Sequence, residues 1–129
     1  MIVLPVRMEF IKSAVTLCSR IDTQEVRNAY NQQLRDDFKN FALRILMSDK
    51  MWGIETFPMD QFDALQIHHI KPISLGGTNK FSNLALVDPE LHREIHREID
   101  LQTSGMKYGD TRKIDLPYFS GILWTIENV

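Results

Sequence analysis

The pattern that most constrains the fold of this chain lies in its second half. Residues 64–70 and residues 84–87 are short apolar runs that predict two strands. Pro72 and a following Gly-Gly pair stand between them and predict a turn-rich connection. Asp88 is a helix-capping residue followed by proline, which favours the first helical position. A helix is therefore expected from there to about residue 99, and the order strand, loop, strand, helix forms a ββα unit.

All four histidines of the chain fall inside this predicted unit. His92 and His96 are four residues apart on the predicted helix, so they project from one face and can reach one metal ion. His68 and His69 stand near the end of the first strand, where neighbouring side chains point to opposite faces unless the strand ends or twists. Pro72, three residues on, favours such an ending. The alternative for His92 and His96 alone is a solvated helix face. The alternative for His68 and His69 alone is a chance His-His pair.

The combination of these residues is more specific than either pair. Two histidines on a strand, two on a helix and Asn83 in the hairpin between them form a sharply specified arrangement. Three imidazoles can supply ligands to a metal ion, whose open coordination positions take water and phosphate. The imidazole left over can act as a base near pH 7 and activate the attacking water.

About a quarter of the chain, residues 66–97, resembles the HNH motif of the colicin and pyocin DNases. The matching residues are His68-His69-Ile70-Lys71-Pro72-Ile73-Ser74-Leu75-Gly76-Gly77, Asn83, His92 and His96. The resemblance implies that His68, His92 and His96 hold one divalent metal ion, which is zinc, nickel or magnesium. It implies that His69 is the general base and that the Asn83 side chain fastens the hairpin and holds the His69 segment in position. Cleavage by such a site leaves 5′-phosphate and 3′-hydroxyl ends.

One position departs from the pattern of those DNases. The toxin DNases carry an acidic residue two positions before the first histidine, paired with an upstream arginine near the scissile phosphate. This chain has Gln66 there, and no arginine stands between residues 45 and 92. Either another residue does this work or catalysis is weaker.

Four basic residues in or beside the motif are candidates for contacts with DNA phosphates: Lys71, Lys80, Arg93 and Arg97. Ordinary solvated charge is the alternative for each of them. The net charge of −2 and the pI of about 6.1 argue mildly against a protein that coats DNA along its whole surface. A local groove can nevertheless be basic on an acidic chain.

The first half of the chain predicts helices. Apolar residues at helical spacing predict one helix over residues 6–20 and a second over residues 23–48. Asp22 is expected to cap the second helix, with Glu25 as its capping-box partner. The apolar stripe that should face the core comprises Val26, Tyr30, Leu34, Phe38, Phe41 and Ile45.

These elements predict a small α+β protein in which N-terminal helices pack on a ββα-metal motif. Its length fits a single domain. Loops are expected over residues 49–62 and 103–111, and a last strand over residues 122–126. The expected parts of the domain are a helical part at 1–62, the ββα-metal motif at 63–100 and a C-terminal segment at 101–129.

Cys18 is the single cysteine, which excludes an intramolecular disulfide and a cysteine-rich zinc site. Its apolar neighbours predict a buried, inert thiol. Arg7, Glu9 and Lys12 interrupt any N-terminal apolar region, so no signal peptide is predicted, and no run is long enough for a membrane span. A cytoplasmic protein is expected or, for a toxin, one delivered into the cytoplasm of the target cell.

We therefore expect a metal-dependent endonuclease that hydrolyses phosphodiester bonds in DNA, rather than RNA, with low sequence specificity. Nothing in the chain resembles a sequence-reading module, and the choice of DNA rests on the family. Two settings stay open: a bacterial toxin or effector domain neutralised by an immunity protein, and a phage-defence or restriction nuclease. A non-enzymatic alternative is a binding domain stabilised by a structural zinc ion, which needs all four histidines around the metal.

Overall fold

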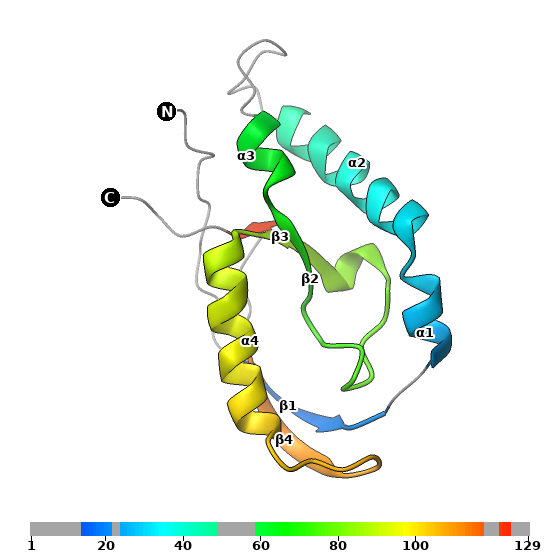
Figure 1. Ribbon diagram of the computed structural model, residues 1–129, viewed down its shortest axis with the longest axis vertical. Coiled ribbons are helices and arrows are strands. Elements are labelled where there is room, and N and C mark those ends of the chain that lie inside the picture. The colour runs from blue at the N-terminus through cyan, green and yellow to red at the C-terminus, as the bar shows by residue number, and fades with distance from the viewer. Residues whose placement is uncertain (1–13, 22–23, 49–58, 118–121, 125–129) are drawn as a thin grey trace.

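The structure is a computed structural model that describes residues 14–21, 24–48, 59–117 and 122–124. Its elements mix helices and strands, in agreement with the expected α+β class (Figure 1). In chain order they are β1 (Ala14–Ser19), α1 (Gln24–Ala29), α2 (Gln32–Ser48), α3 (Met59–Asp63), β2 (Gln66–His69), the short 3-10 helix η1 (Phe81–Asn83), β3 (Leu84–Val87), α4 (Pro89–Thr103), β4 (Thr111–Leu116) and β5 (Leu123–Trp124).

The predicted ββα unit is confirmed by β2, β3 and α4. β2 pairs antiparallel with β3, which places His68 opposite Ala85. α4 begins after Asp88, whose carboxylate accepts a hydrogen bond from the Glu90 backbone N–H at 2.9 Å. This cap and the following proline start the helix where the sequence predicted it. α4 continues to Thr103, beyond the expected end, and Gly105 and Gly109 in the loop that follows have positive φ.

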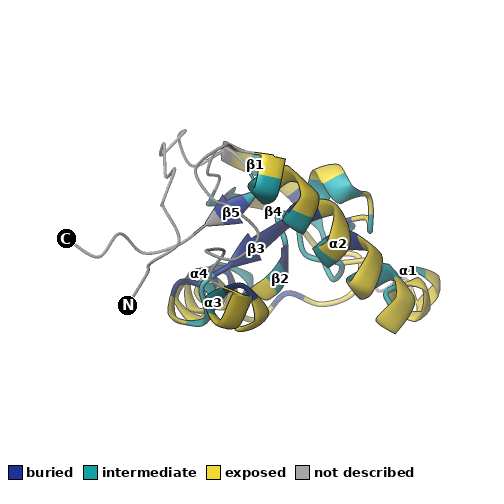
Figure 2. Ribbon diagram, turned by 90° about the horizontal axis from the view of Figure 1, so that it is seen from above, coloured by how far each residue is buried: buried dark blue, intermediate teal, exposed yellow. Residues whose placement is uncertain are grey.

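The buried strand β3 separates two layers of the core. β2, β3 and β5 form a sheet in that order, with β5 parallel to β3. Ala85 and Val87 pack with α4, β1 and β4, whereas Leu84 and Leu86 pack with α2 and α3. This alternation follows from the two-residue period of a strand. Figure 2 shows β3 as a buried strand between helices whose outer faces are exposed.

The helix expected over residues 6–20 is wrong in its described part. The segment forms β1, which pairs antiparallel with β4 along its whole length. Cys18 is fully buried, whereas its neighbour Leu17 is 64% exposed and Val15 is 65% exposed. Over six residues the apolar pattern does not distinguish a strand from a helix, and pairing with β4 selects the strand. Residues 6–13 lie outside the described residues.

The helix expected over residues 23–48 is divided into α1 and α2 at Tyr30 and Asn31. The Asn31 side chain accepts a hydrogen bond from the Leu34 backbone N–H at 3.0 Å, which caps the start of α2. The expected cap Asp22 lies outside the described residues. α3 occupies the last part of the loop expected over 49–62, and residues 49–58 lie outside the description.

The apolar stripe of the second helix was partly wrong. Phe38 and Ala42 are fully buried in α2, whereas Phe41 and Ile45 are 36% and 43% exposed. Phe41 and Ile45 each stand three residues after one of these buried residues, which turns them by about 60° around the helix axis toward solvent. The predicted last strand is present as β5, and residues 125–126 lie outside the description.

The site predicted from the sequence lies along β2, at the edge of the three-stranded sheet as far as the structure describes it. β2 is an edge strand in the described sheet. Figure 1 shows α4 on one side and α1 and α2 on the other, with β2 and the loop after it between them. Among the described helices, none has the length and apolar character to cross a membrane.

Candidate active site

Three of the four histidines come together between β2 and α4. The ligand atoms of His68, His92 and His96 all lie within 4.8 Å of one another. The Nε2 atoms of His92 and His96 are 2.8 Å apart. The His68 ring centroid lies 5.2 Å from that of His92 and 5.7 Å from that of His96. The side chains therefore face a common point.

Local structure explains this convergence. His68 is in β2, on the strand face turned to α4, and is 1% exposed. His92 and His96 are one helical turn apart on α4, and their exposure increases from His92 to His96. The three-histidine group is thus buried at His68 and exposed at His96.

Gln66 sets the orientation of the His92 ring. The Gln66 Oε1 atom lies 2.6 Å from His92 Nδ1. Because a carbonyl oxygen only accepts hydrogen bonds, His92 Nδ1 carries the proton and Nε2 keeps its lone pair for the common point. Metal-ligating histidines typically have such a partner on the second ring nitrogen. Sequence reasoning missed this contact, although Gln66 is two residues from His68 and so shares its strand face.

The environment keeps the imidazoles of His68 and His92 neutral. Burial, together with the neighbouring histidines, lowers the pKa of His68 to about 3. Burial, followed by the charge of His96, lowers the pKa of His92 to about 4. The neutral imidazole is the form that binds a metal ion.

The three-histidine group fits a divalent metal ion. Nitrogen ligands about 2.0–2.1 Å from a tetrahedral zinc ion are about 3.4 Å apart, and the donor atoms here are spaced on this scale. Three imidazoles suit zinc or nickel. Three protein ligands also leave a coordination position for water or substrate, as in catalytic rather than structural sites.

His69 lies on the other side of the strand end. Neighbouring residues of a strand point to opposite faces, and the His69 ring packs against Tyr30 with centroids 4.6 Å apart in an edge-to-face contact. β2 ends at His69, and a pocket of about 290 Å³ there is lined by residues from both sides of the strand. This His69 pocket is lined by His69, His92, His96 and residues that include Arg27, Tyr30 and Ile67.

Asn79 determines which nitrogen of His69 is free. Asn79 Nδ2 donates a hydrogen bond to the Val26 carbonyl oxygen at 2.8 Å, which turns Asn79 Oδ1 toward His69. Oδ1 lies 2.9 Å from His69 Nε2, so Nε2 donates and the lone pair is on Nδ1. Burial lowers the pKa of His69, and the bond to Asn79 partly offsets this. His69 is therefore a neutral imidazole with an available acceptor nitrogen.

Asn79 and Tyr30 were not singled out as site residues from the sequence. Tyr30 was assigned to the apolar stripe of a continuous helix, and the break between α1 and α2 places it against His69. Asn79 stands in a loop without periodic signal, and its two bonds depend on residues ten and fifty-three positions away. No local pattern could have found them.

Asn83 fastens the loop between β2 and β3. Its Oδ1 accepts from the Lys71 backbone N–H at 2.9 Å, and its Nδ2 donates to the carbonyl oxygens of Lys71 at 3.1 Å and Thr78 at 2.8 Å. Its own carbonyl oxygen accepts from the Ile70 N–H at 2.8 Å. These bonds hold the chain that directly follows His69.

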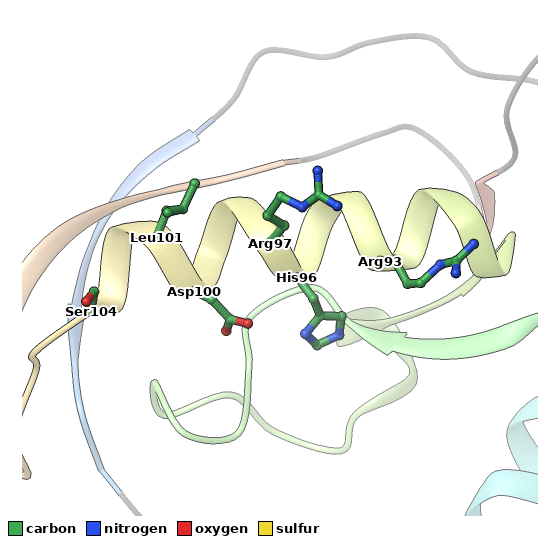
Figure 3. A pocket seen from close by; sticks show the side chains of 6 residues that line it. All are labelled: Arg93, His96, Arg97, Asp100, Leu101 and Ser104. Carbon is green, nitrogen blue, oxygen red and sulfur yellow. The ribbon is translucent and has the colours of Figure 1, made fainter.

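The four predicted basic residues differ in position. Arg93, Arg97 and His96 line a pocket of about 400 Å³ on α4. In Figure 3, His96 projects from one side of the helix and Arg97 from the other. Lys71 and Lys80 line neither this pocket nor the His69 pocket. Lys71 is half-buried and interacts electrostatically with Cys18, whose thiol pKa is raised by burial.

Comparison with protein-family models places this site in a known context. Residues 55–98 match the HNH endonuclease family. The match spans about a third of the 129-residue chain and includes His68, His69, Asn83, His92 and His96. It points to a nuclease-type function for the HNH segment. No curated protein and no solved structure matches the chain, so the closer resemblance to colicin and pyocin DNases stays a prediction.

Proposed function

We propose that the protein is a metal-dependent endonuclease that hydrolyses phosphodiester bonds in DNA with low sequence specificity. The observation that carries the proposal is the convergence of His68, His92 and His96 beside a fourth, separately held histidine, His69. The HNH match over the same residues supports it. The preference for DNA over RNA rests on the resemblance to the DNases.

In this proposal His68, His92 and His96 hold one divalent ion. When bound, the ion supplies Lewis-acid stabilisation of negative charge on the phosphate and on the departing 3′ oxygen. Gln66 keeps the proton of His92 on Nδ1, so that Nε2 stays a ligand. The opening of the group at His96 lets a phosphate approach from the surface.

His69 is the proposed general base. Its Nδ1 takes a proton from water, and the resulting hydroxide attacks phosphorus. The bond from phosphorus to the 3′ oxygen then breaks, and the departing oxyanion takes a proton from solvent water, which leaves 5′-phosphate and 3′-hydroxyl ends. Asn79 keeps the other ring proton on Nε2, and Asn83 fastens the chain after His69.

The structural-zinc alternative is less well supported by this arrangement. That alternative needs four histidines around one ion, whereas the group of possible ligands found in the described residues contains three. His69 Nε2 is instead bonded to Asn79, and its ring packs on Tyr30. Loss of His69 should therefore spare metal binding.

The decisive experiment is nicking of supercoiled plasmid by the purified protein with magnesium, zinc or nickel, beside His69→Ala. We expect the parent to cut and the variant to lose at least about a hundredfold in rate, the contribution typical of a general base. The melting temperature and metal content of the variant should match those of the parent. If the variant unfolds and loses its metal while the parent cuts neither DNA nor RNA, the structural-zinc alternative replaces this proposal.

The biological setting proposed first is a bacterial toxin or effector domain with a small acidic immunity protein as partner, and it rests on the motif resemblance alone. It predicts that expression without the partner kills the host. A phage-defence or restriction nuclease is the alternative, and it predicts that expression alone is tolerated.

A further inference from the structure

A second pocket continues the His69 pocket along α2. The two share Tyr30 and Ile67 among their lining residues, so they adjoin. The second pocket has a volume of about 340 Å³ and lies between α2 and the chain of β2. We call it the α2 groove, and its lining includes the cations Arg35 and Lys39.

Arg35 is held in place before any ligand arrives. Its guanidinium group donates to the Tyr30 carbonyl oxygen at 3.2 Å and to Gln32 Oε1 at 3.0 Å, and it lies 5.3 Å from the centre of the Tyr30 ring. These two bonds use two of its five N–H donors. A guanidinium group fixed in this way loses little side-chain entropy when it binds an anion.

Lys39 extends the same wall of the groove by one helical turn. It is four residues after Arg35, so the two side chains share one face of α2. Its ammonium group lies 3.4 Å from the Asp63 carbonyl oxygen and 5.9 Å from the centre of the Phe62 ring. Arg27 on α1 lines the adjoining His69 pocket. Cations therefore line the path from His69 along α1 and α2.

The groove offers charge rather than surfaces for stacking. One carboxylate, Asp36, also lines it and accepts a hydrogen bond from Gln32 at 2.8 Å. The Tyr30 ring already packs against His69 and against Arg35. A chain with a net charge of −2 thus presents a locally cationic groove that leads to the candidate base.

We propose that the α2 groove binds the sugar–phosphate backbone of the substrate strand beside the cleaved bond, with Arg35 and Lys39 contacting phosphates. The inference rests on the proposed nuclease function and adds a binding surface to it. Binding through phosphates fixes the register of the strand without reading its bases, which agrees with low sequence specificity.

The test compares two double variants with equal changes of charge. Arg35→Gln/Lys39→Gln removes the groove cations. Arg44→Gln/Lys113→Gln is the control, because both residues are exposed, Lys113 lies on β4, and Arg44 is nine residues from Arg35 and so on the opposite face of α2. All proteins carry His69→Ala, and their binding to a short fluorescein-labelled DNA duplex is followed by anisotropy between about 50 and 200 mM salt.

We expect the slope of log affinity against log salt concentration to become shallower by about 1.8 in the groove variant, because each lost phosphate contact contributes about 0.9. The slope of the control should stay unchanged. Equal slopes and affinities in the two double variants would overturn the inference. If the double variant does not fold, Lys39→Gln alone should lower the slope by about one. Arg35→Lys should keep most of the slope, because the charge remains.

The same substitutions in the active protein separate this inference from the proposed function. If the parent cuts DNA and the groove and control variants have equal KM, the nuclease proposal stands and the groove proposal is rejected. If the parent binds DNA with the groove-dependent slope but never cuts it, the groove proposal stands and the nuclease proposal is rejected. If the parent binds no nucleic acid, the groove proposal is rejected.

Discussion

At the scale of single residues, two neutral amides fix the tautomers of two histidines. Gln66 holds the proton of His92 on Nδ1, and Asn79 holds the proton of His69 on Nε2. A carboxylate in either place would favour the charged imidazolium, whereas an amide fixes the tautomer and leaves the ring neutral. The identity of the partner atom therefore decides which ring nitrogen keeps its lone pair.

We predict that Asn79→Ala lowers kcat of DNA cleavage by about 10–100-fold, the range seen when a supporting partner of a catalytic ring is removed. KM should change little, because Asn79 lines none of the pockets at the site. Steady-state kinetics on a labelled duplex measure both constants. Thr78→Ala is the matched control, since the Thr78 side chain has one long contact of 3.4 Å to the Lys80 backbone.

Asn79→Asp keeps the acceptor and adds a charge. It should restore much of kcat but move the acid limb of the pH–rate profile to higher pH, because the carboxylate raises the pKa of His69 and the base must be unprotonated to act. An Asp variant with the parent's pH profile would show that Asn79 does not act through His69.

At the scale of elements, the loop between β2 and β3 is closed by backbone contacts that only glycine permits. A Cβ atom on Gly77 would lie 1.8 Å from the Lys71 carbonyl oxygen, and Gly76 has a φ of +89°. The Gly77 N–H donates to the Pro72 carbonyl oxygen at 2.9 Å. The turn brings Thr78 and Asn79 back beside the end of β2, where Asn83 fastens them.

We predict that Gly77→Ala destabilises the protein by more than about 3 kcal/mol, because the clash is with backbone that is itself hydrogen-bonded. Urea unfolding measures the free energy. Gly105→Ala is the comparison: its φ is +78°, but nothing lies within 4 Å of the added methyl group, so it should cost only about 1 kcal/mol of backbone strain. Equal losses in the two variants would mean that the loop closes in another way.

At the scale of the whole molecule, the site depends on both core layers. His68 is buried against α4 beside one layer, and Tyr30 on the α1–α2 side packs on His69 near the other. β3 joins the layers, so an error in its pairing with β2 would displace His68 and His69 together. The burial that positions His68 also opposes its protonation.

We predict that the metal-free protein loses about 3 kcal/mol of stability through His68 alone between pH 7 and pH 4. The folded pKa of His68 is about 3 and the unfolded value is 6.5, so in this window the unfolded chain binds the extra proton and stability falls as the pH falls. Urea unfolding in the presence of a chelator should show a shallower pH dependence for His68→Gln than for the parent. Identical pH dependence would show that His68 is accessible to protons in the folded state.

The sequence by itself determined the ββα unit, the cap at Asp88 and the placement of His92 and His96 one turn apart on one helix face. Each of these depends on signals within a few residues: alternating side chains, a capping pair, and a four-residue spacing on one helix face. The helix expected over residues 6–20 is wrong in its described part because β1 depends on its partner β4, whose paired residues are 92 to 102 positions away. A six-residue pattern cannot encode a partner at that distance.

Only the tertiary structure decided which side chains surround the histidines. Asn79 reaches Val26, Tyr30 reaches His69, and Arg35 faces the chain of β2 because α1 and α2 pack across the sheet edge. These contacts join segments tens of residues apart, and no periodicity along the chain specifies them. The residue types that can bind a metal are local information, whereas the tautomers of His69 and His92 and the position of the α2 groove follow from packing.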